Sequence, residues 1–158
     1  MKTMKANEVF DDKTTKKITN ELQPVLIDLI ALGLITKQAH WNVVGSSFRA
    51  VHLHLDEIYA GIQENVDTVA ERISALGVPP DGQAKEVAAD AKVNKIPTGF
   101  HNAAEIVDLM TDRVGQACKN IRAHMDKVED LDAVTADMLH GVVEGLEKQL
   151  WMLRVQGM

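Results

Sequence analysis

Four long segments in which apolar residues recur at helical spacing constrain the fold of this chain more than any other feature. They cover approximately residues 20–43, 48–76, 102–128 and 133–155, and no segment shows a sustained alternation of β-branched and polar residues. Short turns separate the first segment from the second and the third from the fourth. A long connection, residues 78–98, joins the second to the third. The pattern therefore predicts an all-α protein made of two helical hairpins and one crossover.

One long crossover between helices two and three is typical of ferritin-like four-helix bundles rather than of simple up-and-down bundles. We expect the first helix to begin at Asn20, which places Pro24 in the first turn, where a missing N–H costs least. An earlier start with a kink at Pro24 is the alternative. A short helix is expected at about residues 85–91. These bounds divide the chain into a mobile tail, residues 1–18, and a bundle, residues 19–158.

The composition excludes several other classes of protein. A chain of 158 residues is long enough for one domain with a sizeable core. Its net charge of −6 excludes a basic nucleic-acid-binding surface over the whole domain. The single cysteine, Cys118, cannot form an internal disulfide. Because Asp28 and Lys37 interrupt the longest apolar stretch and no secretory signal is visible, we expect a cytoplasmic protein without a membrane partner.

The second helix carries four side chains that can bind a metal ion on one face. On a wheel of about 100° per residue, with His52 at zero, they fall between about 0° and 100°, whereas the apolar stripe falls between about 240° and 320°. They form two pairs at i,i+4 spacing: His52 with Asp56, and Asp67 with Glu71. Eleven residues separate Asp56 from Asp67, which is roughly 16 Å along a straight helix. The two pairs therefore cannot meet within one chain.

A second copy of the helix, antiparallel across a two-fold axis near Gly61, would bring the two pairs together. An isologous dimer then has two identical sites by symmetry. His40, at the end of the first helix, is expected at the same height as His52 in the hairpin. Two imidazoles and three carboxylates suit iron, manganese or zinc rather than a metal that prefers thiolates.

Three runs of residues carry a resemblance to a known family. They are residues 38–42 (QAHWN), 50–57 (AVHLHLDE) and 67–72 (DTVAER). These runs resemble the signature of the Dps family, the DNA-binding proteins from starved cells, also called mini-ferritins. The resemblance spans at least residues 34–77, and the helix lengths extend it over most of the chain.

The resemblance implies a hollow shell of twelve subunits that acts as a ferroxidase. It would oxidise Fe²⁺, preferentially with H₂O₂, and store ferric mineral, which protects DNA and the cell from oxidative damage. It would also assign five iron ligands at the dimer interface and place Trp41 beside them, where its ring intercepts stray oxidants. The implied ligands are His40, His52, Asp56, Asp67 and Glu71. Zinc and manganese are the other divalent ions to consider.

Other polar residues admit two interpretations. The acidic stretch between the last two helices, with Asp132 in it, is either a solvated loop or, as in the family, the lining of three-fold pores that attract Fe²⁺. The candidate pore residues are Asp126, Glu129, Asp130 and Asp137. Asp137, His140 and Glu144 are also at helical spacing and could be taken for a set of metal ligands. His140 lies beside the apolar stripe of its helix, which argues against that interpretation. Arg72 offers a simpler interpretation of Asp67 and Glu71, as a solvated helix face. His54 is expected on the surface, and Trp151 in the core or an interface.

The alternative function is a structural nucleoid protein that compacts DNA. Residues 1–17 hold five lysines against three acidic residues, a net charge of +2. Lys2 and Lys5 are the candidate contacts to DNA, which would be non-specific and strongly dependent on salt. Twelve such tails on one shell would add avidity.

Overall fold

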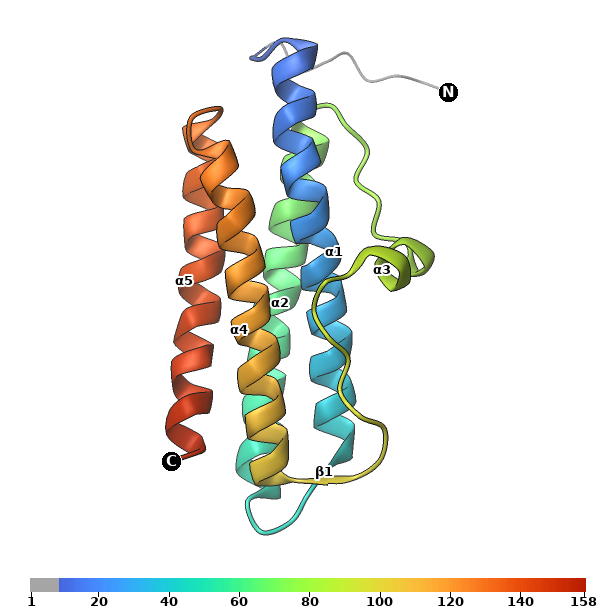
Figure 1. Cartoon of the computed structure of the whole chain (residues 1–158), viewed down its shortest axis with the longest axis vertical. Helices are drawn as coiled ribbons and strands as arrows, with labels where there is room; N and C mark the ends of the chain where they lie inside the picture. Colours follow the sequence, from blue (N-terminus) through green and yellow to red (C-terminus); the bar gives the residue numbers. More distant parts are fainter. Residues whose placement is uncertain (1–8) are drawn as a thin grey trace.

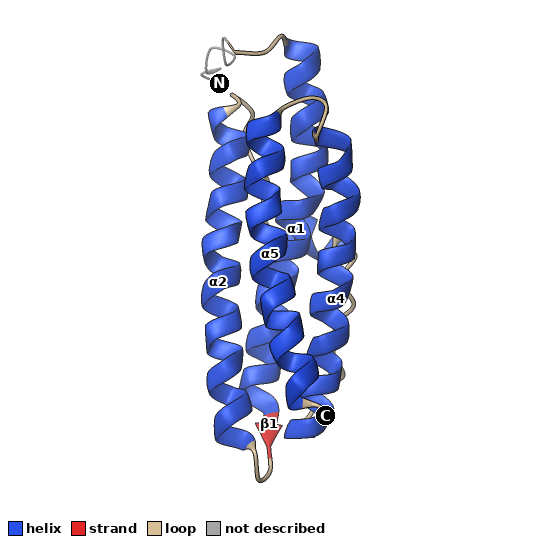
Figure 2. Ribbon diagram, turned by 90° about the vertical axis from the view of Figure 1, so that its left-hand side faces the viewer, coloured by secondary structure: helices blue, strands red, loops and turns tan. Residues whose placement is uncertain are grey.

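The computed structural model describes residues 9–158 as five α-helices and two very short strands. The four long helices lie side by side as one elongated bundle, and the short helix lies in the crossover, outside the bundle and next to α1 (Figure 1, Figure 2). The elements are α1 (Asp12–Asn42), β1 (Val43–Val44), α2 (Phe48–Ala75), α3 (Ala84–Asp90), β2 (His101–Asn102), α4 (Ala103–Val128) and α5 (Ala133–Gln156). The predicted pair of hairpins with one long crossover is confirmed.

The first helix begins earlier than Asn20, so the preferred start was wrong and the earlier start, given as the alternative, is confirmed. Asp11 caps α1 by accepting a hydrogen bond from the Thr14 backbone N–H at 2.7 Å. Ile18 and Leu22 are fully buried, so packing extends the helix upstream of Pro24. The proline therefore lies inside α1 rather than in its first turn. Packing of the preceding turns offsets the hydrogen bond that Pro24 cannot make.

The same observation changes the predicted boundary between tail and bundle. Residues 12–18, assigned to the tail, belong to α1, and Thr15 and Ile18 are buried. Residues 1–8, with Lys2 and Lys5, lie outside the described part of the chain.

The ends of α2, α4 and α5 agree with the predictions to within one or two residues, because a glycine or a capping residue at each of these ends can be recognised in the sequence. Gly77 ends α2 with a φ of 86°, a value that a side chain disfavours. The Val78 N–H then bonds to the Ile73 carbonyl at 3.3 Å. Asn102 caps α4 and Asp132 caps α5 through their side-chain oxygens.

One continuous apolar core runs along the bundle. Leucines and isoleucines from α1 and α2 meet α4 and α5 there, and Leu29, Leu32, Ile58 and Ile62 are at most 1% exposed. Against expectation, α1 is long and apolar enough to cross a membrane by length and composition. In this structure 67% of its apolar window is buried, which also fits a core helix of a soluble protein.

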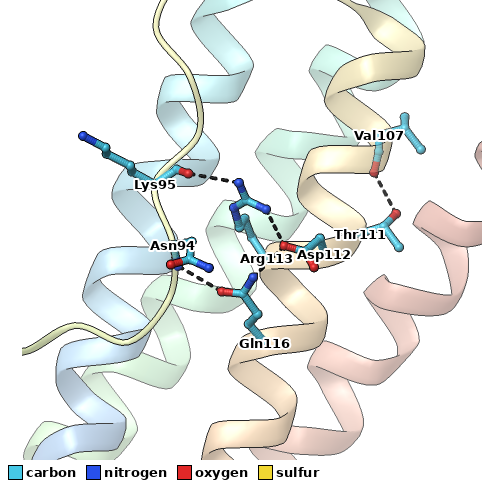
Figure 3. A network of polar contacts seen from close by, with 7 residues as sticks. All are labelled: Asn94, Lys95, Val107, Thr111, Asp112, Arg113 and Gln116. Atoms are coloured by element: carbon cyan, nitrogen blue, oxygen red, sulfur yellow. Dashed lines mark hydrogen bonds and ion pairs between the residues drawn. The ribbon is translucent and has the colours of Figure 1, made fainter.

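Polar side chains fasten the crossover to the bundle. Figure 3 shows Gln116 accepting a hydrogen bond from the Asn94 N–H at 3.0 Å, and Arg113 donating to the Lys95 carbonyl at 3.0 Å. The carboxylate of Asp28, 3% exposed, completes the attachment. It accepts hydrogen bonds from the Lys92 N–H at 2.6 Å and from the Asn120 amide at 2.9 Å.

The two strands were not predicted, because strands of two residues have no sequence pattern. They pair in parallel, with Val43 opposite His101 and Val44 opposite Asn102. The pairing joins the turn after α1 to the start of α4. It therefore fixes the end of the bundle at which His40 and His52 lie.

Asp28→Ala should lower the stability of the protein. The substitution leaves the Lys92 N–H and the Asn120 amide without their acceptor, at a cost of about 2–4 kcal/mol. The measurement is urea unfolding at a fixed protein concentration, with Asp90→Ala, an exposed aspartate of α3, as the control. Equal midpoints for the two variants would contradict the role assigned to Asp28.

Candidate metal centre

His40 and His52 face each other at the end of the α1–α2 hairpin where the turn joins the two helices. Their rings are stacked, with centroids 3.6 Å apart and planes 23° from parallel. Each Nδ1 lies 3.0 Å from the other residue's backbone carbonyl oxygen. A carbonyl only accepts, so in these bonds both Nδ1 atoms carry the hydrogen. In the neutral rings, the Nε2 lone pairs are then available to a metal ion.

Asp56 adds a carboxylate to this pair from the next turn of α2. Its Oδ1 lies 3.3 Å from His40 Nδ1. Within residues 9–158, only His40, His52 and Asp56 form a group of three whose potential ligand atoms lie within 4.8 Å of one another. His40 is buried, while His52 and Asp56 are half-buried. The group is thus open to an incoming ion on one side.

Lys37 holds the Asp56 carboxylate, and nothing in the sequence analysis predicted this. Its Nζ lies 2.9 Å from Asp56 Oδ1. The ammonium also lies 5.9 Å from the centroid of the Trp41 ring and 5.3 Å from that of Tyr59. The hydrogen bond from Lys37, which outweighs partial desolvation, keeps the pKa of Asp56 below its ordinary value.

Trp41 lies next to Lys37, whose ammonium is hydrogen-bonded to Asp56. It is 65% exposed in the single chain, and Leu34, two turns earlier on α1, is 64% exposed. Phe48 was also missed. Its ring centroid is 4.8 Å from that of His52, where it covers one side of the imidazole.

Asp67 and Glu71 do not join the group within the chain. Both are exposed on α2, about three and four turns beyond Asp56. Neither carboxylate has a hydrogen bond or an ion pair with any residue of the described part, 9–158. Their exposure also fits the simpler interpretation, a solvated helix face, although Arg72 binds Asp132 and Thr135 rather than either carboxylate.

The acidic turn between α4 and α5 is only partly as predicted. Asp126, Glu129, Asp130 and Asp137 are exposed, so they stay candidates for a pore. Asp132, by contrast, is 7% exposed and caps α5. A buried cap cannot line a pore, so Asp132 leaves that group.

The structure also bears on the expectations for three other single residues, of which the one for His54 was wrong. His54 is buried, not on the surface, because its Nδ1 and Nε2 contact the side-chain oxygens of Gln156 at 3.2 Å and Gln149 at 2.9 Å. Trp151 is 60% exposed in the single chain, so it does not fill the core, and its place in an interface stays a prediction. Cys118 is buried, and desolvation raises the pKa of its thiol to about 11.

Comparisons with known proteins agree with this geometry. A family model described as a ferritin-like domain matches residues 19–156. The DNA protection during starvation protein of Agrobacterium fabrum is 32% identical over 97% of this chain and 95% of its own length. The chain belongs to the Dps family of ferritin-like proteins.

Two other Dps relatives extend the comparison. DNA protection during starvation protein 2 of Deinococcus radiodurans is 37% identical over 88% of this chain, but the match spans only 58% of that relative's length. The solved structure of Dps from Microbacterium arborescens in the high iron form is 32% identical. It superposes with a TM-score of 0.87 over 92% of this chain and 95% of its own.

Lys37→Gln should strengthen the binding of divalent cations to this group. The substitution removes an ammonium that competes for Asp56, and an exposed competing charge is worth on the order of fivefold in affinity. The measurement is calorimetric titration with Zn²⁺, a redox-inactive probe, using Lys119→Gln on α4 as the matched control. Weaker binding by Lys37→Gln would show that the lysine supports the site rather than competing for it.

Proposed function

We propose that this chain is a ferroxidase and iron-storage subunit that acts as a hollow dodecamer. It oxidises Fe²⁺, preferentially with H₂O₂, and stores the ferric product as mineral inside the shell. The observation that carries the proposal is the convergence of His40, His52 and Asp56, with both imidazoles hydrogen-bonded so that Nε2 is free to bind. Imidazole nitrogens and carboxylate oxygens are donors that suit Fe²⁺. Zn²⁺ and Mn²⁺ are plausible competitors for the same donors.

The remaining ligands in this proposal come from a second copy of the chain. A two-fold axis near Gly61 brings Asp67 and Glu71 of one copy to the histidines of the other. A Cβ added at Gly61 meets no atom within 4 Å, so the helix surface there is open to close approach. The exposed side chains of Leu34 and Trp41 border the same side of the hairpin, and large exposed apolar groups are typical of interfaces.

The chemistry follows from the donors. Carboxylates bind Fe³⁺ more strongly than Fe²⁺, because the harder and more highly charged ion gains more from anionic oxygen, so they favour oxidation. Two Fe²⁺ ions supply the two electrons that reduce one H₂O₂, with two protons, to two waters. Paired oxidation of this kind consumes peroxide without releasing hydroxyl radical. Trp41, beside the centre, is placed to intercept an oxidant that escapes it.

The names of the relatives support a protective role. Two of them are called DNA protection during starvation proteins, and removal of Fe²⁺ together with peroxide protects DNA without any contact to it. Direct DNA binding by Lys2 and Lys5 stays a prediction. The net charge of −6 favours the ferroxidase over the nucleoid protein.

The shared site can be tested by mixing variants. Asp56→Ala and Glu71→Ala should each abolish rapid H₂O₂-driven oxidation of Fe²⁺, because one substitution damages both sites of a homodimer. Refolded as an equal mixture, they should recover about a quarter of the wild-type rate, since half of the dimers then contain one intact site of two. The rate is followed by ferric absorbance, with O₂ as the comparison oxidant.

The matched control mixes Asp56→Ala with His52→Ala. Both substitutions lie in the same half of the proposed site, so no mixed dimer keeps an intact one and no activity should return. Recovery in the control, or none in the first mixture, would contradict a site shared between subunits.

A further inference from the structure

Arg72 places a positive charge directly after Glu71 on α2, yet the structure turns its guanidinium toward α5. Its Nη2 lies 2.5 Å from Asp132 Oδ2, and its Nε donates to the Thr135 hydroxyl at 2.9 Å. The arginine side chain is 22% exposed and that of Asp132 only 5%. The pair is therefore largely withdrawn from water.

Asp132 is held in place from several directions. One carboxylate oxygen accepts from the Val134 N–H at 3.1 Å, and the other accepts from both Thr135 and Arg72. Although burial alone would raise it, these hydrogen bonds keep the pKa of Asp132 below its ordinary value. Asp132 is thus ionised at neutral pH and neutralises the arginine.

The Glu71 carboxylate benefits from this arrangement. Among residues 9–158 it has no ion pair, although an arginine is its neighbour in sequence. Adjacent residues on a helix do not face each other, so the effect of Arg72 on an ion at Glu71 would act through space rather than by contact. A unit charge roughly 8 Å from a divalent ion changes its binding on the order of fivefold in water.

We propose that Asp132 is a positioning residue for the cation site. By binding and neutralising Arg72, it keeps a positive charge away from the cation that Glu71 receives. The inference rests on the proposed function, in which Glu71 is a ligand. It also explains why Asp132, a buried carboxylate on the α4–α5 turn, is paired with Arg72, the residue directly after Glu71.

The test compares two substitutions that break the same ion pair from opposite sides. Asp132→Asn, in which asparagine keeps the ability to cap α5, leaves Arg72 uncompensated and should weaken Zn²⁺ binding on the order of fivefold. Arg72→Gln removes the positive charge and should bind Zn²⁺ as tightly as the wild type or more tightly. The double variant should return to the wild-type affinity. The measurement is calorimetric titration of the full chain with Zn²⁺.

A purely structural role for the pair predicts a different pattern. Breaking the pair would then shift affinity in the same direction for both single variants, and that result would overturn the proposal. The proposed difference between the variants should also shrink as salt increases, because it is electrostatic. If Asp132→Asn does not fold, as judged by circular dichroism, weakened binding by Arg72→Gln alone is sufficient to overturn it.

Glu71→Ala separates this inference from the proposed function. If Glu71→Ala leaves Zn²⁺ affinity unchanged, Glu71 is not a ligand and the proposed function fails, together with the inference built on it. If Glu71→Ala weakens binding while Asp132→Asn does not, the site stands and only the role of Asp132 is wrong.

Discussion

The antiparallel packing of α1 against α2 is the constraint on which the rest of this structure depends. It places the end of α1 beside the start of α2, so that His40 and His52 stack and bond to each other's backbone carbonyls. The carbonyl of His40 lies in the last turn of α1, where helical carbonyls lack partners along the chain, and the His52 ring satisfies it. The contact thus closes a helix end and orients two potential ligands at once.

Much of the fold could be predicted because its signals are local. The apolar periodicity, Gly77 and the capping residues Asn102 and Asp132 indicate the bounds of α2, α4 and α5 without knowledge of the packing. The start of α1 could not be predicted in this way. Its cap, Asp11, competes with a stronger local signal at Pro24, and only the burial of Ile18 decides between them.

The candidate site also has a part that local sequence signals predict and a part that depends on packing between helices. Helical spacing puts His52 and Asp56 on one face, and the position of the turn in an antiparallel hairpin predicts that His40 lies at the height of His52; the three do converge. The spacing of residues along one helix does not predict which side chains of another helix they contact. Lys37 at Asp56, the glutamines around His54 and the pairing of Arg72 with Asp132 all depend on which side chain a neighbouring helix presents. The contribution of a second subunit lies beyond a single chain altogether.

The most direct test of a shared iron centre is to locate the ion. Crystals of the protein grown without oxygen and soaked in Fe²⁺ would be measured at the iron absorption edge, so that anomalous density marks the metal. Two symmetry-related peaks are expected at each dimer interface, each between His40, His52 and Asp56 of one subunit and the carboxylates at positions 67 and 71 of the other. Iron bound instead at Asp137, His140 and Glu144, or no ordered iron at the histidine pair, would contradict a shared centre.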